Sequence, residues 1–212
     1  EELLVPQATS FSVNGDGQLL YSTGAHLTLR NPKDNSATSF DQDGNVLDLW
    51  PALDRHPSEP TTTRPLVFTR YERDTNLDGI IDTDDESSIW MRRWDPQEPH
   101  IQRLYRITPA HQFHIYPAMS GDFLYFSDLK AGDIFRIDIP AFLNDYADLD
   151  HAKTLAATYQ DHGRLDQALL VLSNISQNLL AQQPPEARAE FDFSLAETQT
   201  QEGNFFAARQ SL

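Results

Sequence analysis

The stretch that decides the fold is Phe123-Leu124-Tyr125-Phe126-Ser127, followed by the turn Leu129-Lys130-Ala131-Gly132 and by Ile134-Phe135-Arg136-Ile137. Both apolar runs are short and rich in aromatic and β-branched residues, which is typical of β-strands. The turn between them ends in Gly132, and glycine supplies the positive φ that many hairpin turns need. The sequence therefore predicts a β-hairpin over residues 123–137.

Paired runs of the same kind lie further upstream. Gln18 to Thr23 is followed by His26 to Arg30, and Leu66 to Tyr71 by Ser88 to Arg93. From about residue 11 to 140, short apolar runs alternate with Gly, Asp, Asn and Pro, and helical periodicity is missing. This half of the chain is therefore expected to form antiparallel sheets.

The pattern becomes helical after Pro140. Apolar residues such as Leu155, Tyr159 and Leu169 then recur at the spacing of one helix face, and the prolines at 184 and 185 interrupt the pattern. We therefore expect a β domain over residues 1–142, a polar linker over 143–150 and a helical region over 151–212.

Two segments of the helical half align with each other at a separation of 40 residues: Leu155-Ala156, Tyr159, Gly163 and Ala168 against Leu195-Ala196, Gln199, Gly203 and Ala208. The pattern resembles the tetratricopeptide repeat, in which paired helices pack through small residues. Gln199 departs from the tyrosine of the first copy. The resemblance implies helical hairpins that bind a protein or peptide, truncated here within a longer array.

The β half resembles the TolB-like propeller repeats of bacterial envelope proteins. The resemblance covers roughly residues 8–140, and its residues are Arg103 to Thr108, Pro117 to Asp122, Phe123 to Ser127 and Asp133 to Asp138, with Gly15 to Ser22 and Leu66 to Arg93 as further copies. It implies an α+β multidomain chain: about three β-propeller-like blades, a partial propeller, followed by helices of tetratricopeptide type. Closed propellers have four to eight blades.

An acidic run between two of the expected strands has the spacing of a calcium loop. Oxygen-bearing side chains recur at every second position in Asp74-Thr75-Asn76-Leu77-Asp78-Gly79-Ile80-Ile81-Asp82-Thr83-Asp84-Asp85. Ca²⁺ needs six to eight oxygen ligands and a glycine where the chain turns sharply around it, and Mg²⁺ fits so flexible a cage less well. The predicted ligands are Asp74, Asn76, Asp78, the Ile80 carbonyl, Asp82 and Asp85.

The flanks of this run are strands rather than the helices of an EF-hand. The run therefore resembles the calcium loops between strands of integrin α-subunit propellers, in which position 9, here Asp82, completes the cage. Position 12 is Asp85, whose side chain is shorter than the usual glutamate, and Glu86 follows one residue later. The alternative interpretation is a solvated acidic turn, in which like charges repel one another.

Composition limits the classes of partner. The 212 residues carry a formal charge of −16, which disfavours nucleic acid and anionic membranes and favours cations and basic proteins. The chain has no cysteine and no apolar run long enough to span a bilayer. Glu1-Glu2-Leu3-Leu4 lacks the basic region with which a signal peptide begins, and if a signal once existed, we expect this chain to start after it. Because millimolar calcium occurs outside the cytoplasm, the loop predicts an extracytoplasmic location in the periplasm, cell envelope or secreted fraction.

Other candidate sites carry weaker signals. Asp41 to Asn45 with Asp48 has fewer regularly spaced oxygens than a second cation loop requires. His111 and His114, with His100 nearby, offer imidazoles to a transition metal, but an extended chain directs the first two to opposite faces. The sequence holds no nucleophile elbow, phosphate-binding loop or dinucleotide fingerprint.

The sequence thus favours a non-catalytic scaffold or adaptor that binds a protein partner and contains one structural Ca²⁺. The alternative is an accessory propeller domain of a larger hydrolase or peptidase.

Overall fold

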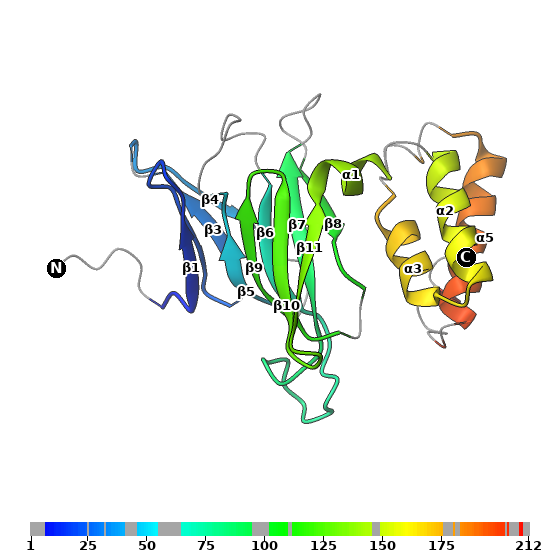
Figure 1. Ribbon diagram of the computed structural model, residues 1–212, viewed down its shortest axis with the longest axis horizontal. Coiled ribbons are helices and arrows are strands. Elements are labelled where there is room, and N and C mark those ends of the chain that lie inside the picture. Colours follow the sequence, from blue (N-terminus) through cyan, green and yellow to red (C-terminus); the bar gives the residue numbers. More distant parts are fainter. Residues whose placement is uncertain are drawn as a thin grey trace. The chain divides into compact units, whose positions relative to one another are not determined.

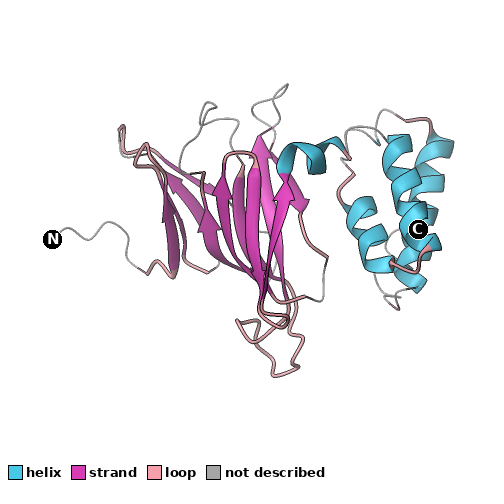
Figure 2. Cartoon of the chain, viewed as in Figure 1, coloured by secondary structure: helices cyan, strands magenta, loops and turns pink. Residues whose placement is uncertain are grey.

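The computed structural model describes residues 7–24, 26–31, 33–40, 46–54, 65–94, 102–109, 112–145, 149–175, 180, 183–201, 203 and 208–209. The chain divides into two compact units, Glu1–Asp138 and Ile139–Leu212. Strands make up the first unit and helices the second (Figures 1 and 2). None of the helices described is long and apolar enough to cross a bilayer.

The first sheet is an antiparallel meander of four strands, β1 (Ser10–Val13), β2 (Leu19–Ser22), β3 (Leu27–Arg30) and β4 (Ala37–Phe40), in chain order. The turn between β1 and β2 is held by Asn14, whose side-chain oxygen accepts the backbone N–H groups of Asp16 and Gln18. The pairing of β2 with β3 confirms the hairpin predicted for residues 18–30.

The second sheet contains the most buried strand. It is formed in chain order by β5 (Leu47–Ala52), β6 (Leu66–Tyr71), β7 (Ser87–Trp94) and β8 (Gln102–Arg106), all antiparallel. Every residue of β6 is buried. Its apolar start, Leu66-Val67-Phe68, is followed by Thr69 and Arg70, which are buried although they are polar. The pairing of β6 with β7 confirms the second predicted hairpin.

The third sheet contains the hairpin that decided the fold. β9 (His114–Ser120), β10 (Phe123–Asp128) and β11 (Asp133–Asp138) lie in the order β11-β10-β9. β10 and β11 pair from Phe123 opposite Asp138 to Asp128 opposite Asp133, as predicted. Gly132 adopts a φ of 75°, and its N–H bonds to the Asp128 carbonyl, which closes the turn.

The first two sheets share an apolar core. Its members lie on β2, β3, β4 and β6 and just after β5, and they are Leu20, Leu27, Phe40, Leu53, Leu66 and Phe68. Alternate residues of β2 point into this core, as expected for a strand with one buried face. Removing these side chains from water is the main favourable term that joins the two sheets.

A buried ion pair lies at the same junction. The Asp48 side chain is fully buried and accepts two hydrogen bonds from the Arg70 guanidinium, at 2.7 and 2.8 Å. The Asp48 backbone N–H donates to the Gly24 carbonyl, and its own carbonyl accepts the Ser22 hydroxyl. Asp48 therefore joins the first sheet to β5 and β5 to β6.

The second unit contains α1 (Ile139–Asn144), α2 (Leu149–Asp161), α3 (Leu165–Ser173) and α5 (Pro185–Gln201). Its core joins residues of α2, α3 and α5 with neighbouring positions, and consists of Leu149, Ala152, Ala156, Val171, Leu172, Ile175, Leu180 and Phe191. Gly163 ends α2 with a φ of 70°, and the Arg164 N–H bonds back to the Tyr159 carbonyl, which is typical of a glycine-terminated helix.

The predicted fold class is wrong in both halves. The described residues form three small open sheets and no closed propeller, and their helices form no repeat region. In the second unit, Leu195 and Ala196 lie within the 17-residue α5, which shares one core with α2 and α3 instead of starting an equivalent helix pair. The alternative of an accessory propeller domain loses its structural basis.

Replacing Asp48 with alanine should lower the free energy of unfolding by about 3–5 kcal/mol, because the Arg70 charge is left buried without its partner. Urea denaturation followed by circular dichroism measures the loss. The double variant Asp48→Ala/Arg70→Met should recover most of it, since neither charge remains. An equal loss in the single and double variants would show that the pair itself is not the cause.

Candidate functional site at the acidic loop

The acidic run lies between β6 and β7, and it forms the long loop that extends beyond the end of the sheets in Figure 1. Its first residues follow Tyr71, and its last residues lead directly into Ser87. The pairing of β6 with β7 reaches Tyr71 and Ser87, so the two ends of the loop are fixed.

The first half of the loop is curled by bonds from side-chain oxygens to backbone N–H groups. The Asp74 carboxylate accepts the N–H groups of Asp78 and Gly79, at 3.1 and 2.7 Å. Asn76 accepts the Asp78 N–H, and Asp78 accepts the Ile80 N–H. Gly79 has a φ of 92°, a conformation that disfavours any side chain. The alternating oxygens thus form successive tight turns.

The second half of the loop is organised around Asp85, which is fully buried although it is charged. Its carboxylate accepts the backbone N–H groups of Thr75, Asn76 and Asp82, at 2.6, 3.1 and 2.9 Å, and the Thr75 hydroxyl at 3.0 Å. Burial alone would raise the pKa of Asp85, but these donors stabilise the carboxylate and the net effect lowers its pKa. Asp85 therefore connects both ends of the loop.

The predicted ligands lie in one loop, but they are not gathered around a point. Asp74, Asn76 and Asp78 occupy the first half, and Asp82 accepts the Asp84 N–H in the second. Over the ranges the structure describes, no three His, Asp or Glu side chains are placed to hold a metal ion. The chemistry of the donors nevertheless suits a hard cation, and a carboxylate with about four acceptor positions retains capacity beyond its backbone bonds.

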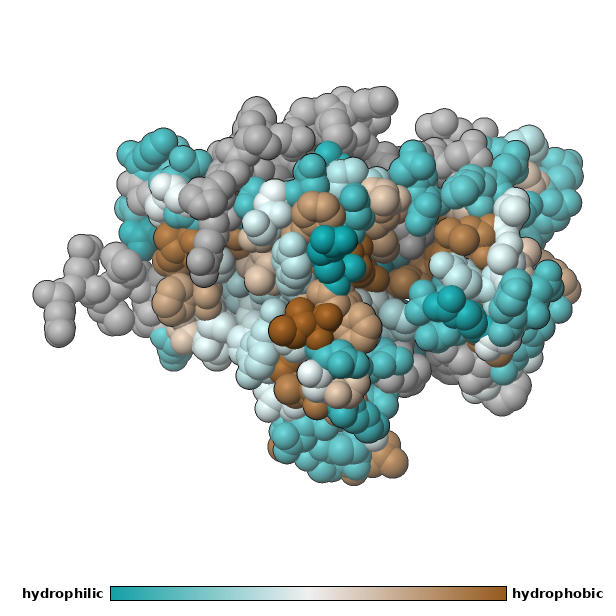
Figure 3. All heavy atoms as spheres, in the orientation of Figure 1, coloured by the Kyte–Doolittle hydropathy of each residue, from teal (hydrophilic) through white to brown (hydrophobic). Residues whose placement is uncertain are grey.

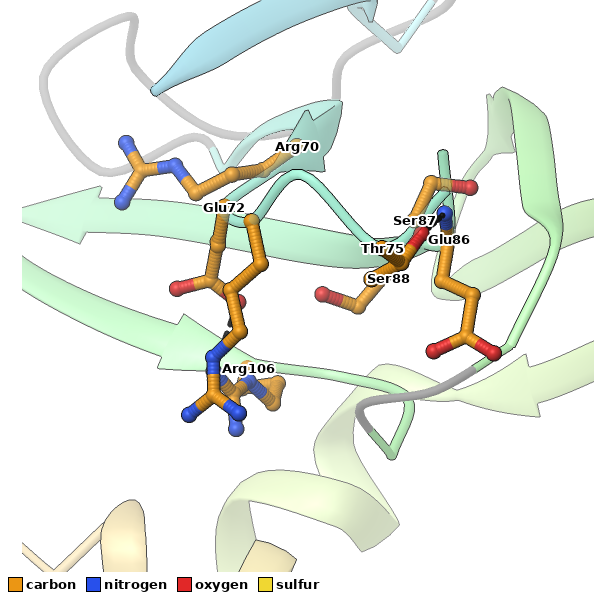
Figure 4. Close-up of a pocket in the computed structure, with 8 residues that line it drawn as sticks. Arg70, Glu72, Thr75, Glu86, Ser87, Ser88 and Arg106 are labelled. Carbon is orange, nitrogen blue, oxygen red and sulfur yellow. Dashed lines mark hydrogen bonds and ion pairs between the residues drawn. The ribbon is translucent and has the colours of Figure 1, made fainter. Parts of the chain in front are cut away.

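A small polar pocket adjoins the loop (Figure 4). It has a volume of about 60 Å³, and the residues that line it come from β6, the loop, β7 and β8: Arg70, Glu72, Arg73, Thr75, Glu86, Ser87, Ser88 and Arg106. Three arginines and two glutamates make the lining strongly charged. The volume suits a few water molecules rather than a large substrate.

The polar groups of the pocket take part in structural contacts. Arg106 donates to Glu72 at 2.6 Å, and its guanidinium lies over the Trp90 ring. The Ser87 hydroxyl donates to the His114 carbonyl at 2.9 Å, and the Ser88 hydroxyl accepts the Trp90 indole N–H. The Ser87 hydroxyl therefore links β7 to β9, whereas the Ser88 hydroxyl bonds within β7.

The end of the loop is attached to the third sheet. The Ser87 N–H donates to the Gln112 carbonyl at 2.6 Å, in addition to the bond from its side chain to His114. Ser87 also forms a parallel bridge with Phe113. The position of β9 is thus coupled to the residue that immediately follows the acidic loop, a connection that the sequence pattern did not indicate.

Of the three histidines in the weaker metal prediction, only His114 lies within the described residues; His100, His111 and Asp41 to Asn45 lie outside them. The His114 ring is buried against Phe126 and Phe135. Its Nε2 lies 3.7 Å from Asp128, and none of the described groups accepts a hydrogen bond from Nδ1. Burial lowers the pKa of His114, and the Asp128 charge partly opposes that effect.

Comparison with known proteins gives no family for this arrangement: no family model and no curated protein matches the chain.

Replacing Asp85 with asparagine should destabilise the first unit by about 1–3 kcal/mol, because an amide cannot accept all the bonds that the buried carboxylate accepts. The matched control is Asp84→Asn, next to it in the chain and exposed, which should change stability by less than about 0.5 kcal/mol. Urea denaturation of both variants provides the comparison. Equal losses would indicate a general effect of loop charge.

The Asp85 carboxylate should also make the free energy of unfolding depend on pH in the acidic range. Since the pKa of Asp85 is lower in the folded state, its contribution is complete above about pH 4 and is lost as the pH falls through the folded-state value. Unfolding free energies measured from pH 6 to pH 2 should therefore fall less steeply in Asp85→Asn than in the wild type. Parallel curves would contradict the assignment.

The protonation of His114 should affect stability at a higher pH than that of Asp85 does. Its lowered pKa means that the unfolded chain binds the proton first, so stability should decrease as the pH falls below about 6.5. His114→Phe, which retains an aromatic ring beside Phe126, should flatten the stability profile between about pH 7 and pH 5. An unchanged profile would show that another group causes the dependence.

Proposed function

We propose that the first unit is a non-catalytic binding module that takes up one Ca²⁺ ion in the loop Asp74–Asp85, where the ion has a structural role. The observation that carries the proposal is the alternation of oxygen donors at Asp74, Asn76, Asp78 and Asp82 in a loop already curled by its own side chains. Alternate oxygens around a glycine turn are what a flexible cation with many ligands requires.

The residues of the loop have two roles: some would bind the ion, and others hold the loop in shape. We assign Asp74, Asn76, Asp78, the Ile80 carbonyl and Asp82 to the ion. We assign Asp85 to holding the loop in shape, because its carboxylate already accepts four hydrogen bonds inside the loop. Binding then requires the outer side chains to turn inward while the two ends of the loop stay fixed by Asp85.

Electrostatics favours the bound state. Five aspartates lie within twelve residues, at positions 74, 78, 82, 84 and 85, in a chain of net charge −16. A divalent cation offsets this repulsion, and at 100 times its dissociation constant a ligand stabilises a fold by about 2.7 kcal/mol. Weak structural sites are filled at millimolar calcium, which supports an extracytoplasmic location.

The binding role is supported by charge and by the use of the polar side chains. A chain of net charge −16 attracts basic partners and repels nucleic acid. The hydroxyls of Ser87 and Ser88 in the pocket beside the loop form structural bonds, which supports a role in binding rather than in catalysis. The proposed partner is therefore a basic protein segment.

Thermal unfolding in excess EDTA and in about 1 mM Ca²⁺ tests the proposal. Calcium should raise the melting temperature of the first unit by roughly 5–10 °C, and Asp78→Ala should abolish that rise. Asp122→Ala, an exposed aspartate in the turn between β9 and β10, should leave it intact. An unchanged wild-type melting temperature would contradict calcium binding, and an equal loss in EDTA would give Asp78 a role independent of the ion.

A further inference from the structure

Two aromatic side chains from different sheets meet at the surface of the first unit. Trp50 lies on β5 and Tyr116 on β9, with their ring centroids 4.7 Å apart and their planes inclined at 62°. Tyr116 is 54% exposed and Trp50 is partly exposed. We call this pair the aromatic corner. The buried Tyr71 ring, at the end of β6, lies 6.1 Å from the Trp50 ring and supports it from within the unit.

Both residues of the corner have an unusual backbone conformation. The φ angle is 48° at Trp50 and 54° at Tyr116, in the left-handed region that bulky side chains disfavour. Each residue is followed by proline and alanine, and each lies where its strand shifts register, β5 on β6 and β9 on β10. Such bulges redirect side chains, and strained positions of this kind cluster at binding sites. The occurrence of this strain at two matching positions therefore favours a binding role for the pair.

The acidic loop begins beside the aromatic corner. Residues 72–86 connect Tyr71 to its pairing partner Ser87, and they carry seven carboxylates and one arginine. Figure 3 shows mostly teal, hydrophilic atoms over this loop at the bottom of the view. Burial raises the pKa of Tyr71, and the charges of Asp82 and Asp84 raise it further, so both carboxylates act on the ring that supports the corner.

The basic groups of the neighbouring strands do not cancel this negative charge. Neither β5 nor β9 contains lysine or arginine. Arg70 on β6 is bonded to Asp48, and Arg106 on β8 is bonded to Glu72. Arg73 is the single arginine of the loop. The aromatic corner therefore lies in a part of the unit whose net charge is negative, which favours a cationic ligand.

The geometry of the two rings favours an ammonium group. A cation is attracted to the face of a Trp or Tyr ring within about 6 Å, and nearby carboxylates add to the attraction. A planar guanidinium stacks on one ring, whereas a compact ammonium can approach two inclined rings together. The aliphatic part of a lysine side chain can also pack against the exposed ring of Tyr116.

We propose that the aromatic corner binds a lysine side chain of a basic partner protein. The inference rests on the binding role proposed above and names the type of residue that the first unit recognises. It does not depend on the calcium ion. A second copy of the chain is disfavoured as the partner, because each copy carries a net charge of −16.

The probe is the capped peptide acetyl-Gly-Ser-Lys-Ser-Gly-amide, whose only charge is the lysine ammonium. Titration into the ¹⁵N-labelled full chain should shift the indole N–H signal of Trp50, assigned with Trp50→Phe, with a dissociation constant of about 1–10 mM. The same peptide with norleucine in place of lysine should bind at least about tenfold more weakly, because it lacks the charge. Equal affinity for the two peptides would overturn the proposal, as would the absence of any saturable shift.

A pair of variants places the site on the protein. Tyr116→Leu keeps an apolar side chain but removes one ring, and it should weaken lysine binding by about fivefold or more. The matched control is Phe11→Leu at a 69% exposed position on β1. The Ser10 hydroxyl accepts the Trp50 N–H, so the side chain of the next residue, Phe11, points to the other face of the strand.

The affinity of Phe11→Leu should equal that of the wild type. Equal affinity in Tyr116→Leu and the wild type would overturn the proposal. The comparison of lysine with norleucine uses the wild-type chain, so it remains decisive if Tyr116→Leu lowers stability.

Three further titrations separate lysine from other ligands. The peptide with arginine in place of lysine should bind at least about threefold more weakly. Tetramethylammonium chloride or cellobiose that binds about tenfold more tightly than the lysine peptide would assign the corner to a free quaternary ammonium or to a sugar. Either result, or tighter binding of the arginine peptide, would overturn the proposal.

The lysine titration is repeated in EDTA and in about 1 mM Ca²⁺ to separate the two proposed sites. Lysine binding without a calcium-dependent melting shift would contradict the calcium site alone. A melting shift without lysine binding would contradict the aromatic corner alone.

Discussion

The first unit depends on the buried pairing of Asp48 with Arg70. Asp48 bonds through its backbone to Gly24 and Ser22 of the first sheet and through its carboxylate to Arg70 on β6. Arg70 in turn lies over the rings of Phe68 and Trp90, so that its charge is enclosed by aromatic faces. Because neither charge is stable without the other in this position, the pair fixes the register of β5 on β6 and the position of the first sheet.

The second sheet is also connected to the third, through the residues at the end of the acidic loop. Asp85 joins the two ends of the loop through its hydrogen bonds. Two residues further along the chain, Ser87 bonds to His114, the first residue of β9, and to Gln112 just before it. A ligand that orders the loop would therefore stabilise the contact between two sheets, which is how a distant surface loop can influence a whole unit. The third sheet ends in β11.

The local strands were predictable from the sequence because their signals are local. The β10–β11 hairpin followed from two short aromatic runs and Gly132, and the structure places every residue of both runs as a paired strand or its turn. The arrangement of the sheets was not predictable in this way. Repeated hairpins occur in propellers and in open sheets alike, so three similar copies did not determine closure. The apparent helical repeat failed similarly, since matching Leu-Ala pairs can lie in helices of different length around one core.

For the candidate site, the spacing of oxygen donors identified the loop but not the roles of its residues. Asp85 was predicted as a ligand from its position in the run, whereas its burial and the four hydrogen bonds that it accepts indicate that it holds the loop in shape. The bonds of Asp85 depend on how the loop closes on itself between Thr75 and Asp82, and the spacing of the oxygen donors does not show this. The link from Ser87 to β9 likewise depends on contacts between residues far apart in the chain.

The most direct test of the account is backbone amide hydrogen exchange over residues 74–87 and 112–114, with and without calcium. If the ion orders the loop, the N–H groups of Asp78, Gly79 and Ile80 should exchange more slowly in calcium, and protection should extend to Ser87 and the start of β9. Identical exchange rates in EDTA and in calcium would contradict the claim that this loop is a cation site.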